Sequence, residues 1–193
     1  MLGIIASALF ISTTAATANG GACPGNPPGM DDSCASKSAK LGEWTVKDFD
    51  FHKEYLFTNP AHQNSHGYVN FMLQNAAAGS ELVCSATSSW LDVFFLGERV
   101  YRCTGPDGEP TGAATFTYND PTSELLINQT WSCNGGGAKY FAQGGVTLDL
   151  DCEETKYKNP DWKGNPGEIY SNDTTACDFV TVAAKIDSVQ KLV

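Results

Sequence analysis

The chain has 193 residues, the length of one domain with at most an appended arm. It carries 12 Lys and Arg and 22 Asp and Glu, so its formal net charge is -10. Phosphate backbones and anionic lipids attract basic surfaces, so an acidic chain is a poor partner for either. Charged residues are 18% and hydrophobic residues 41%, which excludes a disordered polar chain and a coiled coil. We therefore expect one folded domain with neither nucleic-acid nor membrane partners.

Residues 1–18 have the pattern of a secretory signal peptide. An apolar run over 2–11 precedes small residues that end in Ala16-Thr17-Ala18, an A-x-A cleavage site. The run is too short to span a bilayer as a helix, and a buried N-terminal helix is the alternative. The sequence thus predicts a protein that is secreted and then extracellular or cell-wall associated.

Seven cysteines follow the predicted signal peptide, and outside the cell their thiols oxidise to disulfides. There is no C-x-x-C pair, so zinc-knuckle and thioredoxin-like sites have no support. Because seven is odd, one thiol is left free or bridges to another chain. The seven are Cys23, Cys34, Cys84, Cys103, Cys133, Cys152 and Cys177.

The rest of the chain divides into an arm over 19–42, rich in Gly, Pro and Ser, and a domain over 43–193. Short β-branched and aromatic runs in this domain predict about nine strands, and therefore an antiparallel β-barrel or β-sandwich. Gly144-Gly145 predicts a bulge, and 153–176 reads as one long irregular stretch. The expected strands are 44–49, 68–74, 81–87, 90–96, 98–103, 113–118, 124–131, 140–152 and 177–185.

Three motifs in order carry a family resemblance. The run Trp44-Thr45-Val46-Lys47-Asp48-Phe49 opens the domain, Leu82-Val83-Cys84-Ser85-Ala86 follows, and 116–129 reads as strand, turn and strand. This order resembles the major Alternaria allergen family of small secreted fungal proteins. The resemblance implies a compact antiparallel β-barrel without a catalytic constellation, and a fungal effector or elicitor of plant defence, with a role in virulence, that is allergen-like.

The resemblance also implies disulfides. Cys84 and Cys103 match one pair inside the domain of that family, and Cys152 and Cys177 match the second. Cys34 matches a cysteine that joins two chains there. Here Cys23 and Cys133 are additional, so an in-chain bridge from Cys34 stays open, and a homodimer is an open alternative.

The candidates for catalysis or metal binding are few, and we predict no enzyme, no metal site and no cofactor. His62 and His66 have the spacing of two ligands on a helix, but Pro60 and Gly67 flank them, which favours an exposed loop. Asp149 and Asp151 share one face of an expected strand, which favours a solvated acidic face. A hydrolase that uses these carboxylates is the second alternative function.

Surface modification and recognition are the remaining candidates. Asn128 and Asn172 each begin an N-x-[ST] sequon, so both are predicted glycosylation sites of a glycoprotein. Trp162 lies in a Pro- and Gly-containing loop and is the candidate exposed recognition residue. The sequence therefore predicts a secreted protein that acts by binding a host extracellular protein, and a glycan- or small-ligand-binding module is the first alternative.

Overall fold

The computed structural model describes residues 33–108, 113–133 and 138–192, all within one compact unit. In that part of the chain one helix is followed by ten strands, one more than the sequence indicates. The elements are α1 (Cys34–Ala39), β1 (Glu43–Asn59), β2 (His62–Asn75), β3 (Ser80–Ser88), β4 (Tyr101–Thr104), β5 (Ala114–Asn119), β6 (Glu124–Ser132), β7 (Lys139–Thr147), β8 (Cys152–Lys158), β9 (Ser171–Cys177) and β10 (Val180–Leu192).

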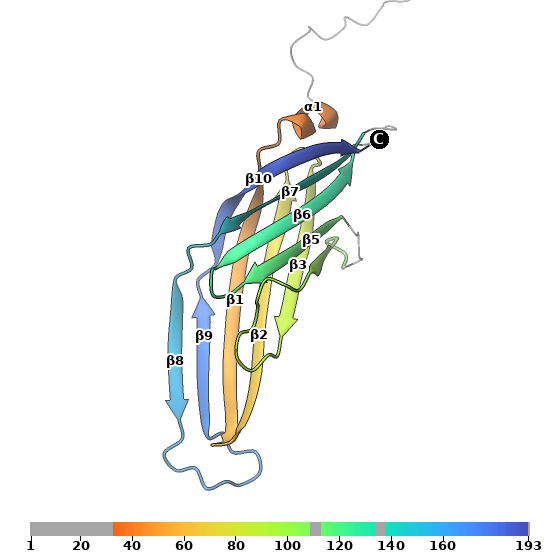
Figure 1. Cartoon of the computed structure of the whole chain (residues 1–193). Helices are drawn as coiled ribbons and strands as arrows, with labels where there is room; N and C mark the ends of the chain where they lie inside the picture. The colour runs from red at the N-terminus through yellow and green to blue at the C-terminus, as the bar shows by residue number, and fades with distance from the viewer. Residues whose placement is uncertain (1–32, 109–112, 134–137, 193) are drawn as a thin grey trace, which may run out of the picture. The chain divides into compact units, whose positions relative to one another are not determined.

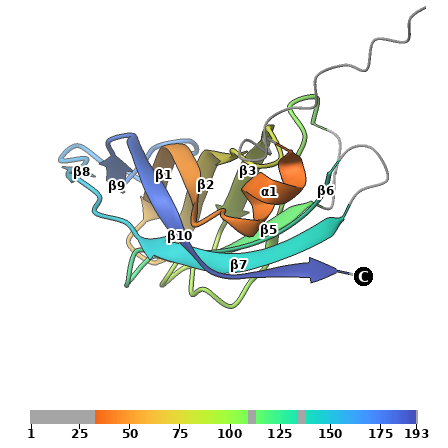
Figure 2. The ribbon, with the colours of Figure 1, turned by 90° about the horizontal axis from the view of Figure 1, so that it is seen from above.

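The strands form a closed antiparallel barrel, as the sequence predicts, and not a sandwich. The sheet order is β10-β7-β6-β5-β4-β3-β2-β1-β9-β8, and an additional pairing of β10 with β1 closes the eight strands β1 to β7 and β10 into a ring. Figure 1 shows these strands from the side, and Figure 2 shows α1 over one end of the ring. Closure leaves the ring itself without a free edge.

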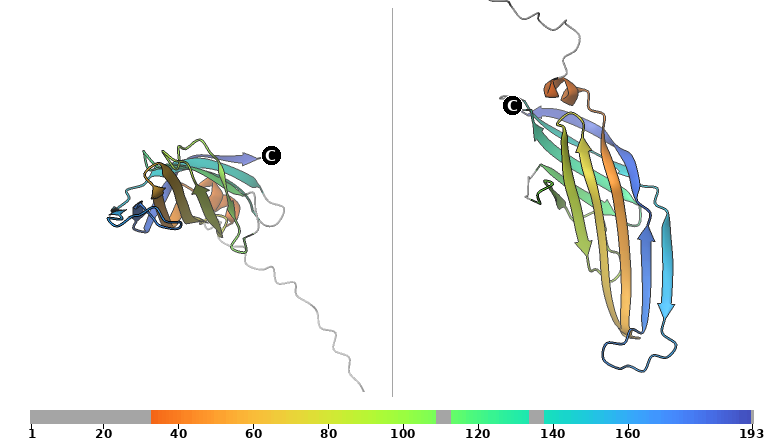
Figure 3. Two further views of the ribbon diagram at one scale, coloured as in Figure 1. Left: turned by 90° about the horizontal axis from the view of Figure 1, so that it is seen from below. Right: turned by 180° about the vertical axis from the view of Figure 1, so that it is seen from behind.

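Strand β1 carries a second sheet segment beyond the ring. Its first part pairs with β10 from Glu43 to Phe49, and its second part pairs with β9 from His52 to Phe57. Strand β2 follows β1 along both parts, and β8 pairs with the far side of β9. The lower halves of β1 and β2 therefore extend past the ring together with β9 and β8, an arrangement visible in Figure 3.

Alternation of buried and exposed side chains explains the ring strands. In β6 the buried positions are Leu125, Ile127, Gln129 and Trp131, and the residues between them face outward. Because successive side chains of a strand point to opposite faces, this period of two requires a half-buried strand. Trp44 is also buried, so Trp44 and Trp131 both belong to the core.

Register shifts interrupt the strand pairing at several positions, and only one of them lies near a predicted position. In β1 the register shifts between Val46 and Phe49, where Asp48 has a φ of 52°. The Gly144-Gly145 bulge is not present, because β7 runs continuously against β6 and the shift lies in β10 between Ile186 and Ser188. A Cβ on Gly144 would overlap the backbone of β10, so this glycine serves close approach.

Three sequence expectations are corrected by the structure. Residues 90–96 form a loop, not a strand, and 153–176 is not irregular because it contains most of the β8–β9 hairpin. The end of the expected arm, from Cys34 to Ala39, is the helix α1 and belongs to the compact unit. No helix in the described ranges is long and apolar enough to cross a membrane.

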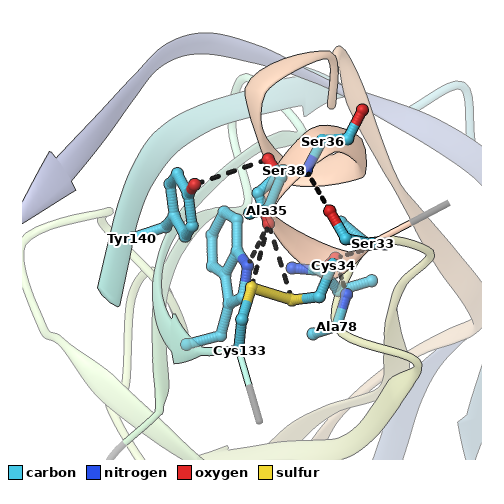
Figure 4. Close-up of a disulfide and its surroundings, with 11 residues drawn as sticks. Ser33, Cys34, Ala35, Ser36, Ser38, Ala78, Cys133 and Tyr140 are labelled. Carbon is cyan, nitrogen blue, oxygen red and sulfur yellow. Dashed lines mark hydrogen bonds between the residues drawn. A yellow bond between two sulfur atoms is a disulfide. The ribbon is translucent and has the colours of Figure 1, made fainter. Parts of the chain in front are cut away.

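Helix α1 is fastened to the barrel by a disulfide and by a buried hydroxyl. Cys34 is bonded to Cys133, which follows β6, and the Trp131 Nε1–H donates to the Ser38 Oγ at 2.8 Å. Ser38 is fully buried, and Figure 4 shows it beside the disulfide and Tyr140. The Cys34 sulfur is therefore engaged within its own chain and does not join two chains, while Cys23 lies outside the described residues.

The other two disulfides join neighbouring strands. Cys84 on β3 lies directly opposite Cys103 on β4, and Cys152 on β8 lies opposite Cys177 on β9. These are the two pairs that the family resemblance implies. The first links two neighbouring strands of the ring, and the second links the start of β8 to the end of β9.

Candidate functional site

The segment 89–100, called here the Trp90 loop, connects β3 to β4 and packs against the extended part of β1 and β2. Phe94 and Phe95 are buried, although they are consecutive residues. The Phe94 ring lies 5.0 Å from that of Tyr55, and the Phe95 ring lies 6.2 Å from that of Phe51. The loop thus adds two aromatic side chains to the core.

Hydrogen bonds to its backbone hold the first half of the Trp90 loop. The Tyr55 hydroxyl donates to the Asp92 carbonyl at 2.7 Å, and the Gln63 Nε2 donates to the Leu91 carbonyl at 2.9 Å. The Ser65 hydroxyl lies 2.9 Å from the Trp90 carbonyl. Because strand side chains satisfy these carbonyls, the loop is an ordered surface held by the sheet.

Four large apolar side chains of this loop face solvent. Trp90 and Val100 are each 62% exposed, Leu91 is 55% exposed and Leu96 is 44% exposed. We call these four residues the Trp90 patch. Single exposed apolar residues are ordinary on protein surfaces, but several within one ordered loop are typical of an interaction site.

A hollow of about 80 Å³ opens at the Trp90 patch. Trp90 and Leu96 form its outer part, and Phe95, Tyr101 and Tyr118 lie deeper. Pockets for drug-sized ligands span roughly 300–1,000 Å³. The hollow therefore suits a single side chain better than a whole small molecule.

Burial keeps two tyrosine hydroxyls beside the Trp90 loop, those of Tyr101 and Tyr118, neutral. Burial raises the pKa of Tyr118 strongly, and the negative charge of Asp120 raises it further, while a contact with Ser123 lowers it less. Burial also raises the pKa of Tyr101, against a smaller lowering by Arg99, whose guanidinium carbon lies 5.6 Å from the Tyr101 ring centre. Both phenols therefore carry no charge at neutral pH.

Gly67 on β2 lies against the Trp90 loop. A Cβ at this position would overlap the Phe94 ring. We expect Gly67→Ala to displace Phe94 and to lower the free energy of unfolding by about 1–3 kcal/mol. Urea unfolding of Gly67→Ala and of Gly42→Ala, where a Cβ meets nothing within 4 Å, measures this effect. Equal stability of the two variants would show that the loop does not depend on this contact.

Trp162 is less exposed than the sequence predicts, and its role in recognition stays a prediction. It is half-buried in the loop between β8 and β9, and its ring lies 5.3 Å from the Tyr170 ring in an edge-on arrangement. The Glu168 carboxylate accepts hydrogen bonds from the Asn165 side-chain amide and from the Lys163 and Asn165 backbone N–H groups, which lowers the pKa of Glu168 and orders this loop. Trp162 therefore stabilises its own loop, while Trp90 is the strongly exposed tryptophan.

The two sequons lie in different surroundings. Asn128 is exposed on the outer face of β6, where a glycan has free space. Asn172 lies half-buried in β9, and its Nδ2 donates to the Glu54 Oε1 at 2.8 Å. Glycosylation of both residues stays a prediction, and at Asn172 a glycan would replace one of the two hydrogens on the Nδ2 that donates to Glu54.

The candidate catalytic and metal-ligating residues stay apart. Asp149 and Asp151 are exposed between β7 and β8. His62 and His66 lie on strand β2 and not on a helix, so the spacing of helical ligands does not apply to them. Within residues 33–108, 113–133 and 138–192, no three His, Cys, Asp or Glu side chains gather so that they could hold a metal ion.

Comparison with known proteins identifies the family of the chain. The family model described as Alternaria alternata allergen 1 matches residues 46–177, more than half of the chain. The chain belongs to the Alternaria alternata allergen 1 family. This family is described by an allergen and not by a catalytic activity, so its new member is an allergen-like protein. The resemblance drawn from the three motifs is confirmed.

One solved structure is similar and no curated protein matches. The crystal structure of the Alternaria alternata major allergen Alt a 1 aligns with 15% sequence identity and a TM-score of 0.36. The alignment covers 78% of this chain and 94% of that chain. No match to a curated protein was found.

The Trp90 patch is a candidate interaction surface that the sequence patterns do not predict. The apolar residues of 93–96 are consecutive, so they do not follow the alternation of a half-buried strand, and Gly97 ends the run. A continuous apolar run also fits a strand buried on both faces, which is why 90–96 reads as one. The run in fact splits between core and surface.

Proposed function

We propose that this protein acts outside the cell by binding a host extracellular protein through the Trp90 patch, as an effector or elicitor of plant defence. The observation that supports the proposal is the exposure of Trp90, Leu91, Leu96 and Val100 on a loop held by strand side chains. Tryptophan is enriched among the residues that dominate binding energy at protein interfaces. The predicted signal peptide and disulfide framework support an extracellular site of action.

The dimensions of the patch favour a protein over a small ligand as partner. The hollow of about 80 Å³ admits one apolar side chain and is lined by Trp90 and Leu96, and Leu91 and Val100 add exposed apolar surface on the same loop. A protein interface needs such a buried centre and a polar rim, which Glu98 and Arg99 supply here. An already ordered loop also lowers the entropic cost of association.

We expect Trp90→Ala to reduce retention of the partner at least tenfold, since removal of a central interface tryptophan costs about 2 kcal/mol or more. The measurement is quantitative mass spectrometry of proteins retained from plant extracellular fluid by the immobilised chain, followed by titration of the retained partner. Phe179→Ala is the matched control, because Phe179 is 70% exposed but lies between β9 and β10.

Two results would contradict the proposal. The first is a partner that binds the wild-type chain and Trp90→Ala with equal affinity. The second is a partner lost only with Phe179→Ala. A defence response in plant tissue that is unchanged by Trp90→Ala would separate elicitor activity from this surface.

A further inference from the structure

Strand β8 is the free edge of the described sheet. It stands at the end of the strand order and pairs only with β9, and all seven of its residues, from Cys152 to Lys158, are exposed. A strand at a sheet edge presents unpaired N–H and C=O groups, which form a template for another strand. Figure 1 shows β8 at the outer side of the extension.

The hydrogen-bond pattern tells which β8 residues face the free side. Two bonds bracket the hairpin, because the Asp178 N–H donates to the Asp151 carbonyl at 2.9 Å and the Asn159 N–H donates to the Tyr170 carbonyl at 2.8 Å. In an antiparallel pair the bonded residues alternate along each strand. The odd-numbered residues of β8 therefore bond to β9, and Glu154, Lys156 and Lys158 direct their backbone groups outward.

The order of charges along this edge is self-complementary. We propose that β8 pairs antiparallel with β8 of a second copy of this chain, about a two-fold axis at Thr155. In that register Glu154 of each copy lies opposite Lys156 of the other, and the outward backbone groups of both residues meet as bonded pairs. The two β8 strands then continue one sheet through both molecules.

The alternative registers of the β8–β8 pair are weaker because they place like charges opposite one another. Bonded pairs require even-numbered residues opposite even-numbered residues. With the axis at Glu154, Glu154 of one copy lies opposite Glu154 of the other. With the axis at Lys156, Lys156 lies opposite Lys156 in the same way. With the axis at Tyr157, Lys156 of one copy lies opposite Lys158 of the other. Directly opposed like charges destabilise a strand pair. Only the axis at Thr155 opposes unlike charges at the outward positions without such a clash.

A second copy is favoured over a different protein because the complementarity is internal. Glu153 and Glu154 balance Lys156 and Lys158, so the paired segment is neutral although the chain carries a net charge of -10. One short strand buries a small interface, so the expected association is weak and concentration-dependent. This surface is separate from the Trp90 patch, and the proposal does not depend on the proposed function.

The first test is charge reversal, measured by sedimentation over a dilution series that reaches millimolar concentration. The wild-type chain is expected to self-associate, whereas Lys156→Glu and Glu154→Lys each place like charges opposite one another and are expected to weaken self-association at least tenfold. An equimolar mixture of these two variants restores unlike pairs, and so does the double variant with itself. The same dilution series with the Cys23→Ser variant distinguishes this self-association from a disulfide between the Cys23 thiols of two chains.

The second test fixes the register. Thr155→Cys is expected to give a covalent dimer on air oxidation, with the two introduced thiols bonded to each other in peptide mapping. Lys158→Glu is the matched control, because at this register it faces Cys152 of the second copy and is expected to leave association nearly unchanged.

Several outcomes would overturn the inference. One is a wild-type chain that stays monomeric throughout the concentration series. A monomeric chain that binds an extended peptide of another protein along β8 would overturn it in the same way. Another is self-association that survives both single reversals, which would place the contact elsewhere. Loss with Lys158→Glu but not with Lys156→Glu would assign a different register. None of these results affects the Trp90→Ala test.

Discussion

Replacing Cys34 and Cys133 together with alanine is expected to lower the free energy of unfolding by about 4.7 kcal/mol, the largest effect among the three disulfides that the structure describes. The reason is loop length, because this bridge joins residues separated by 99 positions and so restricts the unfolded chain most. The variant also frees helix α1 from the barrel and uncovers the contact between Ser38 and Trp131.

Urea unfolding followed by tryptophan fluorescence measures this loss. The matched control is the pair Cys84→Ala and Cys103→Ala, which opens a bridge with a separation of 19 and is expected to cost about 3 kcal/mol by the same loop-closure relation. A loss smaller for the Cys34–Cys133 bridge than for the control would contradict the account of α1 as a covalently held end of the barrel.

Gln129→Leu is expected to destabilise the protein by about 2–4 kcal/mol. The Gln129 Oε1 accepts hydrogen bonds from the Trp44 Nε1–H and from the Asn75 Nδ2, each at 2.8 Å, and all three side chains are buried. Leucine keeps the volume but leaves two buried donors without their acceptor, and each such donor costs about 1–3 kcal/mol.

Gln143→Leu is the control for this prediction. It makes the same substitution on the exposed face of the neighbouring strand β7, away from the predicted glycosylation site Asn128, and is expected to shift stability by less than about 0.5 kcal/mol. Equal midpoints for the two variants in thermal unfolding would show that the hydrogen bonds of Gln129 contribute nothing to the barrel.

The strands of the ring were predictable because one face of each is buried. Leu125, Ile127 and Trp131 recur with a period of two, and the same period marks β2 and β3. The hairpin of β8 and β9 lacks this signal, because every β8 side chain is exposed and β9 carries mainly polar residues. Hydrogen bonding to the long β1 forms that hairpin, and such long-range pairing leaves no local pattern in the sequence.

The candidate site shows the same limit. The partner of Cys34 lies 99 residues away, and only the folded barrel brings Cys133 beside it. The exposure of Trp90 depends on Tyr55, Gln63 and Ser65, which hold the loop from another strand pair. Trp162 was placed correctly in a loop, but its contact with Tyr170 removes much of its surface from solvent.

Hydrogen–deuterium exchange of the chain with and without its retained plant protein tests the central claim most directly. The account predicts new protection of amides within residues 89–100 on binding, with the ring strands β5 and β6 unchanged. Protection confined to residues 159–170 or to the outer face of the ring, with 89–100 exchanging as in the free chain, would contradict it.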